Sequence, residues 1–356
     1  MNSIEKPKSE NKLENGEKEA FTSVSRILGR RYEDISEEEK KDVLENIETI
    51  FKSQEDFREA LMEAYGSPEN IPDESIKTIF FERPKNPEEI EIINIINEKT
   101  NELRKKFGLS LLNVSPENIY IIPEASWPRS IRNFGYYSPV RQFIVVREQL
   151  ESISLVLAES ILHEMIHFKS YNSLKKIEDF NSFETYRVGL ETKKRDGSDQ
   201  GYFKTLNEAI VEKLTIRLLK ELRSYPIFKK EFEQTDKFRR ILLDKETNKG
   251  ETLINGDEFY INFDQEKSKW LILRFEGIQE RRILNKLEEK IFTSERNKGK
   301  FKNKEDIFNM FVEAAMTGKI VRLGRLIDNS FGEGTFRKVA EESDINKLEE
   351  LIDGLG

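Results

Sequence analysis

The feature that most constrains this chain is the segment at residues 161–168, which reads Ile-Leu-His-Glu-Met-Ile-His-Phe. Its apolar residues favour a helix, and four residues of α-helix turn through about 400°, so His163 and His167 share one face. Two neutral imidazoles so placed can hold one zinc ion, and Glu164 between them can act as general base toward an attacking water. The segment therefore predicts a helix that carries a hydrolytic zinc site.

The histidine and cysteine counts narrow the set of ligands. The chain has 356 residues, no cysteine and two histidines, both of which lie in this motif. A catalytic zinc takes three protein ligands and a water, so the third side-chain ligand is expected to be a carboxylate. A helical scaffold protein with a fortuitous motif is the alternative, and the confinement of both histidines to one pentapeptide argues against it.

The composition also excludes several classes of protein. The net charge of −8, from 59 basic and 67 acidic residues, argues against a general nucleic-acid binder. The lack of cysteine excludes disulfides and fits a reducing compartment. No apolar leader and no run of about 18 apolar residues is present, so we expect a cytoplasmic protein without a membrane span. The sequence does not indicate an oligomeric state.

The chain is long enough for two or three domains, and the pattern predicts four regions. Residues 1–20 are expected to form a disordered tail and residues 21–84 a small helical region. Residues 85–224 are the expected catalytic domain. Residues 225–356 are expected to hold a hairpin followed by helices. The predicted fold class is α+β, mostly helical, with a small sheet beside the motif helix.

Local patterns place the expected elements. In the helical region, helices are expected from about Phe21, where Val24, Ile27 and Leu28 have helix spacing, then at residues 36–50, and finally up to Gly66. In the catalytic domain we expect, in order, a helix at 88–107, strands at 118–123 and 142–146, and the motif helix at 152–170. A hairpin is expected from strands at 259–263 and 270–273.

Two strands followed by a metal-bearing helix resemble the upper half of the zincin metallopeptidases, and residues 118–220 look like a zincin. A later helix at residues 205–214 reads Thr-Leu-Asn-Glu-Ala-Ile-Val-Glu-Lys-Leu. Its Asn-Glu-Ala resembles the segment that carries the third ligand, a glutamate, in the gluzincin branch. The resemblance covers under a third of the chain. It implies a zinc peptidase that acts on a peptide or protein substrate.

The resemblance assigns roles to two acids of this later helix. It places Glu208 as the third zinc ligand, and Glu212, four residues on, would orient a ligand histidine. The swapped assignment stays open, as does the view of both as solvated helix acids. The metzincin pattern is excluded, because no third histidine follows His167.

A peptidase of this kind also needs a donor for the developing oxyanion. No further histidine is available, so the donor is expected to be one of four residues of the ligand-bearing region: Tyr171, Tyr186, Arg187 and Tyr202. By the resemblance, the substrate is expected to lie along an edge strand at 142–146. Residues 192–201 are expected to form a polar loop, either a lid or a surface excursion.

One further function stays open. The same fold can serve as a binding or regulatory module with little or no turnover. The intact Glu164 argues against this alternative, because a protein without hydrolytic activity has no chemical need for a general base.

Overall fold

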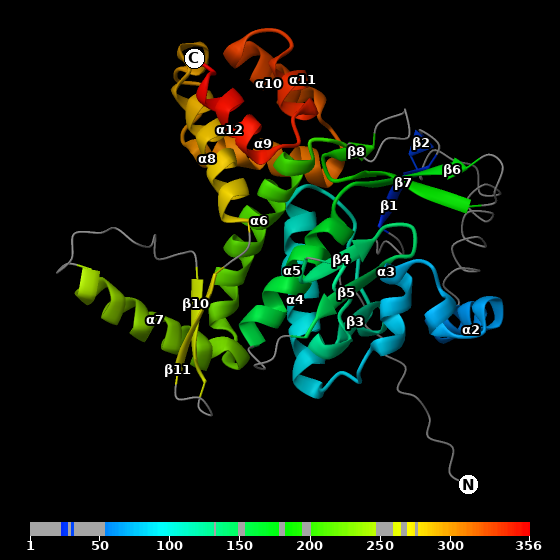
Figure 1. Ribbon diagram of the computed structural model, residues 1–356. Helices are drawn as coiled ribbons and strands as arrows, with labels where there is room; N and C mark the ends of the chain where they lie inside the picture. Colours follow the sequence, from blue (N-terminus) through cyan, green and yellow to red (C-terminus); the bar gives the residue numbers. More distant parts are fainter. Residues whose placement is uncertain are drawn as a thin grey trace.

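The structure is a computed structural model. It describes residues 23–27, 30–31, 54–131, 133–148, 154–177, 182–193, 201–246, 259–264, 269–274 and 277–356. It is an α+β fold, mostly helical with small sheets, as predicted (Figure 1). The predicted tail at 1–20 and the predicted helix at 36–50 lie outside the described residues. Within the described ranges, no helix is long and apolar enough to cross a membrane.

A three-stranded sheet and two helices form the centre of the molecule. Strand β3 (Ile119–Ile122) pairs in parallel with β5 (Phe143–Arg147), and β4 (Gly135–Ser138) pairs antiparallel with the other side of β5. Helix α5 (Ser154–Lys169) packs against this sheet and against α4 (Pro87–Lys106). These elements confirm the helices and strands predicted between residues 88 and 170.

Sequence chemistry explains why α4 forms where it does. The Asn86 side chain accepts a hydrogen bond from Glu89 N, and the Glu89 side chain accepts one from Asn86 N, which closes a capping box. Gly108, with φ of +69°, follows the last turn. Between these ends Ile93 and Ile96 are fully buried against the core. The helix therefore has a fixed start, a fixed end and one apolar face.

The strand order corrects one prediction. The strand at 142–146 was expected to offer a free edge to the substrate, but β5 is paired on both sides, with β3 and with β4. Strand β4 is the edge strand next to α5. The prediction was wrong because residue alternation shows that a strand exists and does not show its place in the sheet.

Described residues between His167 and Glu208 form a second sheet together with an N-terminal segment. Its order is β2-β1-β6-β7-β8-β9. The bounds of its strands are β1 (Val24–Ile27), β2 (Arg30–Arg31), β6 (Asn172–Ile177), β7 (Ser182–Val188), β8 (Glu191–Lys193) and β9 (Gly201–Tyr202).

One prediction fails in this second sheet, and another is contradicted only at its ends. The helical spacing at Val24 and Ile27 belongs to a strand, because β1 pairs in parallel with β6. The expected polar loop at 192–201 is contradicted at its two ends, because residues 192 and 193 lie in β8 and residue 201 lies in β9. The rest of this prediction, residues 194–200, lies outside the described residues. A pattern of three or four residues fits either period, so long-range pairing decides the outcome.

Helices make up most of the remaining structure. Helix α2 (Gln54–Tyr65) ends at Gly66, as predicted, and the short α3 (Glu74–Lys77) follows. The hairpin of β10 (Phe259–Asp264) and β11 (Lys269–Arg274) is also confirmed. The other helices are α6 (Lys204–Glu221), α7 (Pro226–Glu246), α8 (Ile278–Thr293), α9 (Lys304–Thr317), α10 (Val321–Phe331), α11 (Thr335–Glu341) and α12 (Ile345–Asp353).

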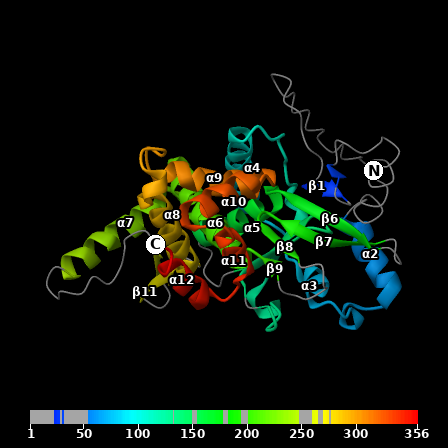
Figure 2. The same ribbon diagram turned by 90° about the horizontal axis from the view of Figure 1, so that it is seen from above.

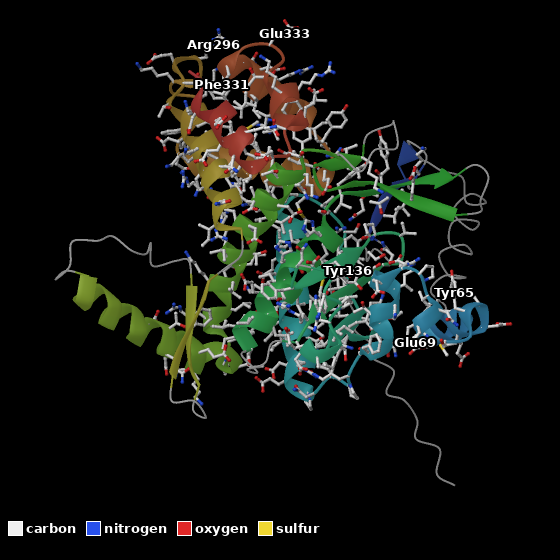
Figure 3. All side chains as sticks on the ribbon, in the orientation of Figure 1. Tyr65, Glu69, Tyr136, Arg296, Phe331 and Glu333 are labelled. Atoms are coloured by element: carbon white, nitrogen blue, oxygen red, sulfur yellow. The ribbon has the colours of Figure 1, made fainter. Side chains whose placement is uncertain are left out.

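The C-terminal helices are packed on the motif region. One apolar core runs from Ile92 in α4 to Ile352 in α12. Helix α6 contacts both α5 and α8, so it connects the two parts of this core, and α8 to α12 lie together beside it (Figure 2). At the outer end of this bundle, Arg296 and Glu333 point away from the molecule (Figure 3). The start of α8 is thereby brought next to α6.

Candidate metal centre

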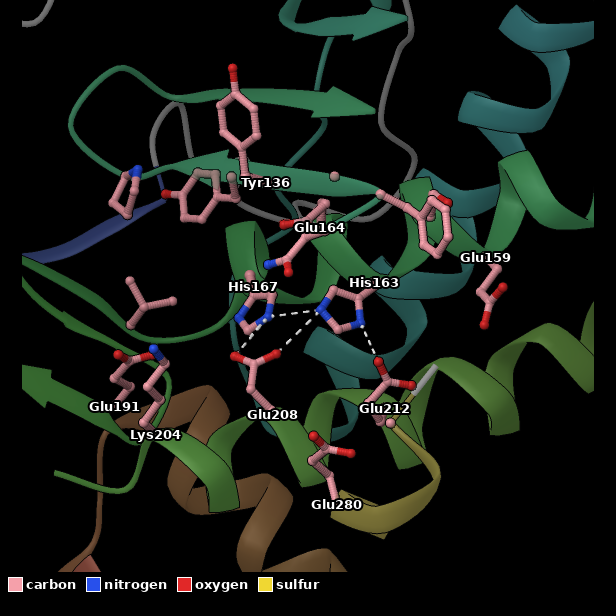
Figure 4. Close-up of a pocket in the computed structure, with 18 of the residues that line it drawn as sticks. Tyr136, Glu159, His163, Glu164, His167, Glu191, Lys204, Glu208, Glu212 and Glu280 are labelled. Carbon is pink, nitrogen blue, oxygen red and sulfur yellow. Dashed lines mark hydrogen bonds and ion pairs between the residues drawn. The ribbon is translucent and has the colours of Figure 1, made fainter. Parts of the chain in front are cut away.

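Helices α5 and α6 place the predicted ligands in a cleft of about 720 Å³ (Figure 4). The walls come from edge strand β4, from α5 and α6, and from the residues at the start of α8. His163, Glu164 and His167 face it from α5, and Glu208 and Glu212 face it from α6. The structure thus brings all five predicted residues together, although α5 and α6 are separated by the second sheet in the sequence.

The spacing of three side chains fits a metal ion. The Nε2 atoms of His163 and His167 are 3.2 Å apart. Each lies 3.5 Å from an oxygen of Glu208. Metal–ligand distances of about 2.0–2.1 Å in a tetrahedron place ligand atoms about 3.3 Å from one another. These three residues can therefore hold a metal ion, and two histidines with one glutamate are among the donor sets found at catalytic zinc sites.

Glu212 has a different position. Its Oε1 lies 3.2 Å from Nδ1 of His163, the ring nitrogen that does not face Glu208. A proton on Nδ1, donated to this carboxylate, leaves Nε2 with a free lone pair for a metal. Glu208 therefore lies where it can bind a metal together with the two histidines, whereas Glu212 lies where it can orient the ring of His163.

The electrostatics of the cluster favour a bound positive charge. Burial lowers the pKa of His163, but its hydrogen bonds to Glu208 and Glu212 outweigh burial and raise that pKa well above the usual value. The pKa of His167 is also raised, mainly by the charge of Glu208 against the effect of burial. Burial raises the pKa of Glu208, but the two imidazoles hold it far below its usual range. A divalent cation would replace protons in such a site.

Glu164 also lines the cleft, but it is not one of the three residues that could hold a metal ion. Its side chain is 7% exposed, and burial raises its pKa despite the nearby imidazoles. Strand β4 passes close above it, so a Cβ at Gly135 would lie 3.1 Å from Glu164 Cγ and 3.3 Å from its Oε1. A glycine at this strand position leaves the carboxylate room to face the cleft.

None of the four predicted oxyanion donors is among the described residues that line the cleft. The Arg187 guanidinium donates to the carbonyls of Gly189 and Gly318, at 2.7 and 3.2 Å, and covers the ring of Tyr171. It therefore ties β7 to the end of α9. Tyr186 lies on the same strand and Tyr202 packs on the apolar core.

The tyrosines that do line the cleft have other partners. The Tyr136 hydroxyl donates to the carbonyl of Ser75, and Tyr137 shares hydrogen bonds with Ser23 and Gln142. Lys204 is the one lysine or arginine among the described lining residues. It is the first residue of α6 and lies beside Glu191 (Figure 4). Its spacing to Glu208 and Glu212, at i+4 and i+8, puts all three on one helix face, a signal that sequence reasoning could have used.

The comparisons with known proteins return nothing similar. The chain matches no protein-family model, no curated protein and no solved structure. Any assignment of function to this cleft therefore rests on the residues that form it.

Proposed function

We propose that this protein is a zinc-dependent peptidase, with His163, His167 and Glu208 as the zinc ligands. The observation that carries the proposal is that the Nε2 atoms of His163 and His167 lie 3.2 Å apart in the cleft, and that each lies 3.5 Å from one of the two oxygens of Glu208. When bound there, zinc would supply an activated water and polarise the scissile carbonyl. The gluzincin resemblance of the two motif-bearing segments supports the same reaction.

The protein's own residues divide the remaining work. Glu164 takes a proton from the attacking water and passes it to the leaving amine, a role that its place in the cleft beside the two imidazoles allows. Lys204 supplies positive charge for the developing oxyanion, in place of the tyrosine or arginine donors expected from the sequence. The free edge of β4 lies along the cleft and can pair with an extended peptide.

The test compares zinc content and cleavage of a peptide library for the wild type and two variants. Glu164→Gln should keep its zinc and lose about 10²- to 10⁴-fold in kcat. Glu159→Gln, on the same helix and lining the same cleft, is the matched control and should stay within a few-fold of wild type. Equal cleavage by both variants would contradict the role of Glu164.

The alternative function, a binding module with little turnover, predicts a different result in the same experiment. The wild type would then bind zinc and peptide without cleaving any member of the library. Less than about half an equivalent of zinc, unchanged by His163→Ala, would contradict both functions.

A further inference from the structure

Glu212 is held from two sides by residues far apart in the sequence. Its Oε1 lies 3.2 Å from Nδ1 of His163, and its Oε2 lies 3.3 Å from Nη1 of Arg281 in α8. Glu212 is 5% exposed and Arg281 is 8% exposed. The contacts form a buried chain from the C-terminal helices to a candidate zinc ligand.

The start of α8 is shaped to this carboxylate. Gly277 comes directly before the helix and has φ of +68°, a conformation that glycine adopts without strain. A Cβ there would overlap Cγ and Cδ of Glu212 and lie 2.9 Å from its Oε2. The carboxylate thus lies against the amino end of a 16-residue helix, where the helix dipole favours negative charge.

We propose that Arg281 is a positioning residue for the metal centre, acting through Glu212 on the imidazole of His163. The inference rests on the proposed zinc site. A buried carboxylate paired on one oxygen by a guanidinium is held in one orientation. The other oxygen can then keep the proton of His163 on Nδ1, so that Nε2 presents its lone pair toward Glu208 and His167. The C-terminal helices would in this way set the zinc affinity of a site whose ligands lie on α5 and α6.

The first measurement is zinc affinity by competition with a chelator. Changes to residues that orient a ligand histidine cost about 10- to 100-fold in metal affinity, and Arg281→Gln should lose about tenfold. Arg281→Lys keeps the positive charge but not the planar guanidinium group, so its zinc affinity should fall by less. Combined with Glu212→Gln, Arg281→Gln should add almost nothing, because both act through one contact. Additive losses would contradict the proposed chain of contacts.

The matched control is Arg217→Gln. Arg217 in α6 pairs with Glu305 in α9 through two contacts of 2.6 Å, so it also joins α6 to the C-terminal helices. It does not line the cleft, and its loss should leave zinc affinity unchanged. A loss in Arg217→Gln equal to that in Arg281→Gln would assign the effect to general helix packing and overturn the proposal.

A second measurement does not need zinc. Because the chain has only two histidines, NMR of nitrogen-labelled histidine in the metal-free protein gives two imidazole signals, which ligand variants can assign. At a pH high enough to leave both imidazoles neutral, His163 should carry its proton on Nδ1 in the wild type and lose this preference in Arg281→Gln and in Gly277→Ala. An unchanged tautomer together with unchanged zinc affinity would overturn the inference alone. A wild type that binds no zinc would overturn the proposed function instead.

Discussion

Helix α5 has two buried polar clusters of opposite composition. Toward the cleft, its two histidines meet the carboxylates of Glu208 and Glu212. At its C-terminal end, Lys169 is fully buried and donates to Asn97 O and Asn101 Oδ1, at 3.1 and 3.2 Å. Arg104 donates to the backbone carbonyl of Lys169 at 2.6 Å. One cluster joins imidazoles to acids, whereas the other joins two basic side chains to neutral oxygens.

The difference in charge means that the acid-rich cluster favours binding of a cation, whereas the cluster at the C-terminal end of α5 is complete without one. Carboxylates around the histidines favour a positive charge that comes from solution. At the other end, burial and the charge of Arg104 lower the pKa of Lys169 well below its usual value. Burial lowers the pKa of Arg104 to about 10, which still leaves its guanidinium charged at neutral pH. This second cluster of Lys169 and Arg104, which we call the rear cluster, thus joins α4 to the end of α5, two residues beyond His167.

Zinc removal should give the largest effect and should act on the cleft cluster alone. A ligand present at about 1,000 times its Kd stabilises the folded state by about 4 kcal/mol, so a chelator should lower the stability of the wild type by about that amount. Urea unfolding with and without chelator measures it. His163→Ala should respond little to chelator, whereas Lys169→Met should respond like the wild type. A chelator effect that persisted in His163→Ala would place the metal elsewhere.

Loss of Lys204 should give the next largest effect, on turnover. Removal of one donor to an oxyanion costs about 10²- to 10³-fold in kcat, and Lys204→Met should fall near the lower value because this side chain is exposed. Steady-state cleavage and zinc content are the measurements, and zinc should be unchanged. Arg187→Gln is the informative control, since it should lower stability and spare kcat. A loss of kcat in Arg187→Gln, with an unchanged kcat in Lys204→Met, would instead support Arg187 as the oxyanion donor.

Lys169 should give the rear cluster a pH dependence of stability. Its pKa is lowered on folding, so between the folded and unfolded pKa values the unfolded chain binds a proton that the folded protein releases. The free energy of unfolding should rise with pH across this window, by up to about 1.4 kcal/mol per pH unit for one proton. Urea unfolding of wild type and Lys169→Met between about pH 7 and pH 10 measures the difference. A difference that does not change with pH would mean that Lys169 stays charged when buried.

The smallest expected effect concerns substrate charge. Glu159, Glu191 and Glu280 also line the cleft, where Lys204 is the one lysine or arginine among the described residues. Peptides with lysine or arginine near the scissile bond should be cleaved about five- to tenfold faster than acidic ones, which corresponds to about 1 kcal/mol for partly exposed charges. The preference should weaken in high salt and in Glu280→Lys. Equal cleavage of basic and acidic peptides would contradict it.

Sequence reasoning succeeded where one helix or one composition rule decides the answer. The register of His163, Glu164 and His167 follows from 3.6 residues per turn, and the choice of a carboxylate as the candidate third ligand follows from the lack of other donor types. Helix α4 and strands β3 and β5 were found because caps, glycine and β-branched runs act locally.

The remaining features depend on contacts between distant segments. Strand order places β4 at the edge of its sheet and pairs β1 with β6. It also directs the Arg187 side chain to the carbonyl of Gly189 and not into the cleft. The contact of Arg281 with Glu212 joins residues 69 positions apart. The sequence by itself determined which atoms can bind a metal, because helix geometry is local. The tertiary structure decided what surrounds them, because packing between distant elements leaves no periodic pattern along the chain.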